Sequence, residues 1–152
     1  MLRTQITDAM KDAMRTKDER ALATTRLMIS RMRELDIAAR PKGNTEGIGD
    51  AEILSMLQGM VKQRRESIAA YEKGGRADLV KQESEEIAVI ERFMPKQMDE
   101  AAVKAAIDKA VAETGAASVK DMGKVMGELK KAYAGQMDFS QAGALVKARL
   151  AG

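Results

Sequence analysis

The chain has 152 residues and a net charge of +3, with 45% hydrophobic, 32% charged and only 3% aromatic residues. It contains no cysteine, which excludes disulfides and thiol catalysis, and no histidine, which removes the commonest general base and metal ligand. We find no secretory signal and no apolar run near the roughly 20 residues that span a bilayer, so we expect a cytoplasmic protein without membrane contact. The abundance of Ala, Met, Leu, Glu and Lys predicts an all-α fold.

Apolar residues recur with helical spacing along the chain, and glycine, proline and capping residues divide them into seven predicted helices. An N-terminal domain of about four helices is predicted for residues 1–95, and a small C-terminal three-helix domain for residues 96–152. The helices are expected at about residues 2–15, 19–39, 51–73, 78–94, 100–114 and 119–133, and from residue 138 onwards.

Caps and turns mark the ends of the helices in the first domain. Asp18 and Asp50 are the predicted N-caps of the second and third helices, because an aspartate side chain accepts hydrogen bonds from free backbone amides there. Residues 41–49, PKGNTEGIG, contain three glycines, a proline and an asparagine, and are predicted to form a flexible surface loop. Gly74 and Gly75 form the predicted turn between the third and fourth helices.

An arginine and two glutamates interrupt the apolar faces of the third and fourth helices. Arg64 lies in the apolar stripe of the third helix, and Glu83 and Glu86 lie in that of the fourth. Helices joined by a short glycine turn usually pack antiparallel, which would bring Arg64 toward one of the glutamates. The favoured interpretation is a structural ion pair that fixes the register of the two helices. The alternatives are acid–base chemistry by the paired carboxylates and an arginine that reaches outward to a phosphate.

The predicted helix at residues 119–133 has the most one-sided charge in the chain. Lys120, Lys124 and Lys131 fall within about 40° of one another on a helical projection. The opposite, apolar stripe consists of Val119, Met122, Val125, Met126, Leu129 and Tyr133. Gly127 lies close to the lysine face and Gly123 at its edge, where missing side chains leave room for another backbone or for a phosphate strand.

Two interpretations of this lysine face stay open. It is either an ordinary solvated face whose glycines allow close helix crossing, or a surface that follows the phosphates of a nucleic acid. The few aromatic residues disfavour base stacking on a single strand, so a structured RNA recognised by shape and backbone suits the chain better. The candidate nucleic-acid-binding residues are Lys120, Lys124, Gly127, Lys130, Lys131, Lys147 and Arg149.

The search for catalytic and cofactor motifs is negative. There is no phosphate-binding glycine loop of the P-loop or dinucleotide type, and no serine in a nucleophile motif. The carboxylates form no metal-ligand cluster beyond Glu83, Glu85 and Glu86. We therefore expect no catalytic residue, no cofactor and no metal.

Four motifs occur in a specific order along the chain: RLMIS at residues 26–30, VKQRRESIAAYEKGGRADL at 61–79, ESEEIAVIERFMP at 83–95 and SVKDMGKVMGELK at 118–130. Through these motifs the chain resembles the YqeY family over essentially its whole length. That family is similar to the C-terminal tail of GatB, the B subunit of the tRNA-dependent amidotransferase. The resemblance implies a helical N-terminal domain joined to a small three-helix domain.

The resemblance also implies a function. The tail of GatB is understood to help hold the tRNA, while the amidation chemistry lies in other domains and subunits. The leading hypothesis is therefore a non-catalytic module that binds tRNA or another structured RNA through its helix 119–133, and assists an amidotransferase or the translation apparatus. The alternatives are a protein-interaction adaptor without RNA affinity and an amidotransferase subunit, a carbon–nitrogen ligase with glutamine as nitrogen donor. The residues do not supply the activated nucleophile or the phosphate-binding groups that this reaction needs.

Overall fold

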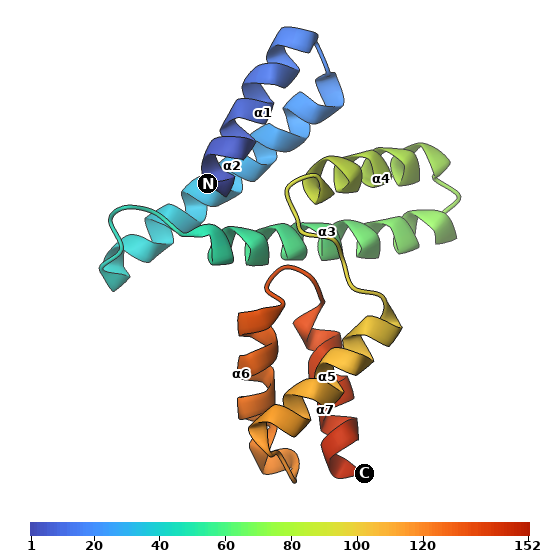
Figure 1. The fold of residues 1–152 in the computed structure, drawn as a ribbon. Coiled ribbons are helices and arrows are strands. Elements are labelled where there is room, and N and C mark those ends of the chain that lie inside the picture. The colour runs from blue at the N-terminus through green and yellow to red at the C-terminus, as the bar shows by residue number, and fades with distance from the viewer. The chain divides into compact units, whose positions relative to one another are not determined.

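The computed structural model describes residues 1–152 and consists of seven α-helices and two short 3-10 helices, without strands (Figure 1). The prediction of an all-α fold is confirmed. The chain forms two compact units, Met1–Met94 and Pro95–Gly152, and each contains a hydrophobic core of its own. No helix combines the length and the apolar character that crossing a membrane requires.

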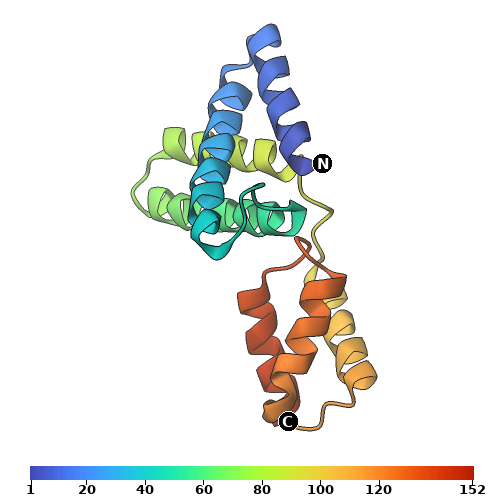
Figure 2. The same ribbon diagram turned by 90° about the vertical axis from the view of Figure 1, so that its left-hand side faces the viewer.

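The first unit is built from two antiparallel helix pairs, α1 with α2 and α3 with α4, which pack across one another (Figures 1 and 2). The helices are α1 (Leu2–Thr16), α2 (Glu19–Ala39), α3 (Asp50–Lys73) and α4 (Ala77–Glu91). Asp18 is the N-cap of α2 as predicted, and its side chain accepts a hydrogen bond from the backbone N–H of Ala21. The core joins all four helices through fully buried side chains, which include Ile6, Met28, Leu57 and Ile90.

The segment between α2 and α3 is a surface loop as predicted, and contacts with the rest of the first unit hold its end in place. After a 3-10 helix (Arg40–Lys42), the chain returns to the core at Ile48, which is only 5% exposed. The guanidinium of Arg3 contacts both carboxylate oxygens of Asp36 at 2.8 Å and also donates to the carbonyl of Ile48. Asp36 in turn accepts from the Ile48 N–H at 2.9 Å. An ion pair between distant parts of the chain therefore fixes a segment whose composition alone indicates mobility.

Asp50 has a different role from the one predicted. Gly49 occupies the N-cap of α3, and Asp50 is the first residue of the helix. Its Oδ1 accepts from the backbone N–H of Leu2 at 3.1 Å and lies 3.4 Å from the amino group of Met1. The carboxylate thus serves the first turn of α1, where negative charge is also favoured by the helix dipole.

The second unit is a three-helix bundle of α5 (Glu100–Thr114), α6 (Met122–Ala132) and α7 (Phe139–Ala151). Val125 and Leu129 of α6 are completely buried against α5 and α7. The predicted helix at 119–133 differs at its start, where a 3-10 helix (Val119–Asp121) precedes α6. Val119 is 41% exposed and lies outside the core, so its place in the predicted apolar stripe is wrong.

Candidate nucleic-acid interface

The candidate nucleic-acid-binding lysines at residues 120–131 are exposed in the structure. Lys120 lies in the 3-10 helix that precedes α6, and Lys124, Lys130 and Lys131 lie in α6 itself. Lys130 and Lys131 occupy the last turn, where the partial negative charge of the helix C-terminus favours cations. The amphipathic pattern fixes their exposure, because Val125 and Leu129 are the residues of α6 that are fully buried.

None of these four ammonium groups has a carboxylate within 4 Å, in contrast to the lysines of α5. There Lys104 lies 3.3 Å from Glu100, and Lys109 lies 3.9 Å from Glu113. The positive charge on α6 is therefore not neutralised by an ion pair within the chain, and it is available to a partner.

Two acidic residues border this surface. Glu128 is exposed and lies about 40° around the helix from Lys124. Asp121 accepts hydrogen bonds from the backbone N–H groups of Ala117, at 2.9 Å, and Ser118, at 3.2 Å. These bonds, with a smaller contribution from Lys124, hold the pKa of Asp121 below its usual value. The exposed lysines are thus bordered by carboxylates, and Asp121 stays ionised because it caps the turn.

The glycines of α6 face open space. A side-chain carbon built on Gly123 or Gly127 would meet no atom within 4 Å, so neither glycine supports close helix packing within the chain. That role belongs to the buried Gly143 of α7, where such a carbon would lie 3.6 Å from the methyl group of Met122 and 3.9 Å from that of Met126. Sequence analysis missed Gly143, although the small pair at residues 142–143 between apolar positions was a signal.

The two candidates on α7 differ from each other. Lys147 is exposed and has no ion pair. Arg149 contacts Asp108 of α5 through Nε and Oδ1 at 3.1 Å, so part of its charge is already compensated. We therefore regard Lys147 as the better candidate of the two.

The second set of candidate residues lies in the first unit, where Arg64 of α3 contacts Glu86 of α4. Arg64 Nε lies 2.9 Å from Glu86 Oε2, and the two side chains are 12% and 11% exposed. Gln82 donates to the other oxygen of Glu86 at 3.3 Å, and Arg20 of α2 approaches that oxygen at 3.8 Å. Sequence analysis missed Arg20, which also contacts Glu85 at 3.1 Å and extends the network to a third helix.

Glu83 stands apart from this pairing. No cation lies within 4 Å of its carboxylate, and burial raises its pKa, with the negative charge of Glu86 adding to the effect and Arg64 partly opposing it. Although Glu83, Glu85 and Glu86 are close in sequence, no group of three or more carboxylates is arranged to hold a metal ion. The ion pairs of Arg64 and Arg20 with Glu86 connect α2, α3 and α4, which is the geometry of a structural ion-pair network.

The fold and the site together define a class of protein with two helical units, one of which carries exposed lysines without ion pairs. The chain belongs to the YqeY family, because the family model described as "Yqey-like protein" matches residues 3–150. No curated protein sequence matches the chain.

Proposed function

We propose that this YqeY-family protein is a non-catalytic module that binds tRNA or another structured RNA through α6 and the turn before it. The observation that carries the proposal is the exposure of four lysines without ion pairs, at positions 120, 124, 130 and 131. Lysines of this kind bind the phosphate backbone and release its counterions, which gives affinity that depends strongly on salt and little on sequence.

The open glycines support the same proposal. Gly123 and Gly127 remove side-chain bulk beside the lysines, and nothing in the chain fills the space. A sugar–phosphate strand can therefore approach the helix backbone more closely there than at an ordinary helix surface.

The aromatic residues support recognition by shape. The protein has two tyrosines and two phenylalanines, and none of the four is exposed. Tyr133 and Phe139 pack against the core of the second unit, and Phe93 against that of the first. Base stacking needs exposed aromatic faces, so this partial burial favours a folded RNA held by its backbone. The similarity of the family to the tail of GatB makes tRNA the first RNA to test, and an amidotransferase or a translation protein the first protein partner.

A titration of labelled tRNA, followed by fluorescence anisotropy at several salt concentrations, tests the proposal. We expect the variant with Lys120, Lys124 and Lys131 replaced by Glu to bind more weakly at every salt concentration, and the slope of log affinity against log salt to fall in magnitude by about 2 to 3. A control with Lys96, Lys104 and Lys109 replaced by Glu changes the net charge equally within the same unit. Equal losses in both variants would show that net charge, rather than the α6 surface, governs binding.

A further inference from the structure

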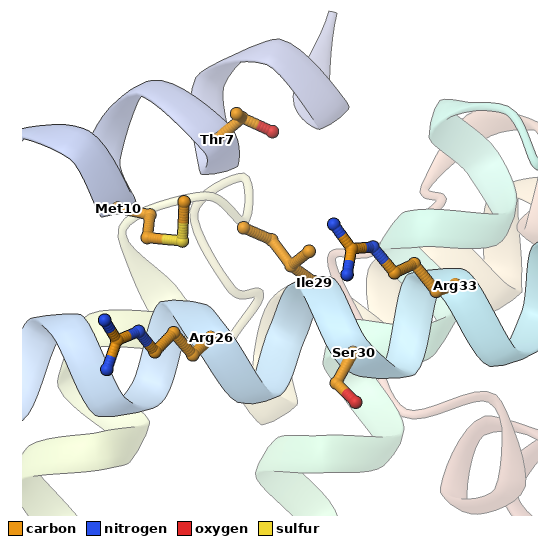
Figure 3. Close-up of a pocket in the computed structure, with 6 residues that line it drawn as sticks. All are labelled: Thr7, Met10, Arg26, Ile29, Ser30 and Arg33. Carbon is orange, nitrogen blue, oxygen red and sulfur yellow. The ribbon is translucent and has the colours of Figure 1, made fainter.

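A second cationic feature lies in the first unit, where a hollow of about 310 Å³ opens between α1 and α2 (Figure 3). Thr7 and Met10 of α1 form one side, and α2 contributes Arg26, Ile29, Ser30 and Arg33. In Figure 3 the two arginine side chains extend from α2 on either side of Ile29, across the hollow from Met10. The site therefore combines two guanidinium groups with an apolar wall.

The two arginines share one face of α2. They are seven residues apart, which places them about 20° apart around the helix and about 10 Å apart along its axis. Neither has a carboxylate within 4 Å, although other arginines of the same helix are paired: Arg20 contacts Glu85 at 3.1 Å and Arg31 contacts Glu34 at 2.7 Å. Two neighbouring positive charges are left uncompensated where the surface is hollowed.

The nearby acids are engaged elsewhere. Glu34 follows Arg33 directly, but its carboxylate is bound by Arg31. Asp36 lies one turn further along the helix, and its two oxygens accept from the fork of Arg3 and from the Ile48 N–H. The chain thus supplies no carboxylate to Arg33 from its own helix, and an anion from outside would complete the site.

Ser30 adds a free hydroxyl at the rim. Thr24 and Thr25 of the same helix donate their hydroxyl hydrogens to the carbonyls of Arg20 and Ala21, but the Ser30 hydroxyl makes no hydrogen bond within the chain. In Figure 3 it points away from α1, so the guanidinium groups carry the binding and Ser30 contributes at most at the edge.

We propose that this hollow binds the phosphate group of an organic phosphomonoester or phosphodiester. The planar fork of arginine matches the oxygens of phosphate and forms short, charge-assisted hydrogen bonds with them. The hollow is larger than one phosphate group and lies at the lower end of small-molecule sites, about 300–1,000 Å³. Met10 and Ile29 can accommodate the organic part of the ligand, which distinguishes this site from a bare anion site.

The test uses the full chain with Lys120, Lys124 and Lys131 replaced by Glu, so that the outcome does not depend on the function proposed for α6. Amide NMR signals of residues 26–33 are followed during titration with phenyl phosphate and, as the matched carboxylate, with benzoate. We expect saturable shifts with phenyl phosphate, and binding weaker by at least about tenfold with benzoate. Equal affinity for the two probes would overturn the proposal of a phosphate site.

Substitutions locate the binding. Replacing Arg26 and Arg33 together by Ala is expected to weaken phenyl phosphate binding by at least about tenfold, because two charge-assisted contacts are lost. Replacing Arg15 and Arg76, two exposed and ion-paired arginines that do not line the hollow, is the control and should leave it unchanged. Absence of saturable shifts, or equal losses in both double variants, would contradict the proposal.

A third probe separates the two sources of the phosphate. If a short oligoribonucleotide shifts the same amides and depends on Arg26 and Arg33, the site takes the backbone of RNA. If only phenyl phosphate does so, the site takes the phosphate of a small ester.

Discussion

Replacing Arg64 with Ala should destabilise the first unit strongly. The substitution removes the guanidinium that contacts Glu86 at 2.9 Å, in a place where both side chains are nearly nine-tenths buried. Breaking a buried pair by removing one partner typically costs about 3–5 kcal/mol, because the remaining charge stays buried without compensation. Arg20 still approaches Glu86 at 3.8 Å, so we expect the lower end of this range, about 3 kcal/mol.

Thermal and urea unfolding followed by far-UV circular dichroism measure this loss. For a unit of this size, about 3 kcal/mol corresponds to a decrease in Tm of roughly 12–24 °C. Lys62 of the same helix is exposed and has no ion pair, so Lys62→Ala is the control and should change stability by less than about 0.5 kcal/mol. Similar Tm values for the two variants would refute the reasoning that the Arg64 network holds α3 and α4 together.

A double-mutant cycle assigns the effect to the pair. If Arg64 acts through Glu86, then Arg64→Ala and Glu86→Gln should be non-additive, with a coupling energy of about 1–3 kcal/mol. A coupling near zero would indicate that the loss comes from the packing of the arginine stem rather than from the charge.

Three further predictions concern the loop, an unpaired acid and the glycines. Asp36→Asn should lower the free energy of unfolding by about 1–2 kcal/mol at pH 7. The hydrogen bond from Arg3 lowers the pKa of Asp36 in the folded protein. The stabilisation by this carboxylate is therefore complete above the ordinary carboxyl pKa and is lost as pH falls through the lower pKa of the folded state. Urea unfolding at acid pH should then give the same free energy of unfolding for the native chain and the variant. Burial raises the pKa of Glu83, so the ionised carboxylate is less stable in the folded protein than in the unfolded chain. Glu83→Gln should therefore raise Tm at pH 7, and the gain should vanish as pH approaches about 4, where the carboxyl is protonated in both states. A lower Tm at pH 7 would show that the carboxylate has a partner. Gly143→Leu should lower the free energy of unfolding by about 1–3 kcal/mol by overpacking against Met122. Gly127→Ala should raise it by about 0.5–1 kcal/mol, because alanine favours the helix and the site is open. Shifts of the urea midpoint in the same direction for both variants would contradict the assignment of buried and open glycines.

Local structure could be predicted from the sequence because it depends on residues that are close together in the chain. The spacing of apolar residues indicates seven helices, and the position of Asp18 indicates the start of α2; the structure confirms both. The exposure of the lysines of α6 follows in the same way from the opposite, buried positions of Val125 and Leu129. These features need no knowledge of the tertiary fold.

Features that depend on contacts between distant segments could not be predicted. The loop after α2 is fixed by Arg3, more than thirty residues earlier, and Asp50 bonds to the start of α1 instead of capping its own helix. Arg20 joins the Glu86 network only because α2 packs against α4. The hollow beside Arg26 likewise exists only because α1 lies against α2. Helical spacing places each of these side chains on a face of its helix, but it does not say what that face meets.

The salt dependence of tRNA affinity, compared between the native chain and the variant with Lys120, Lys124 and Lys131 replaced by Glu, tests the central claim most directly. If the α6 surface holds the RNA backbone, the native chain gives a steep negative slope and the variant a much shallower one, with weaker binding at every salt concentration. Identical slopes and affinities for the two proteins would contradict the claim and remove RNA binding from α6.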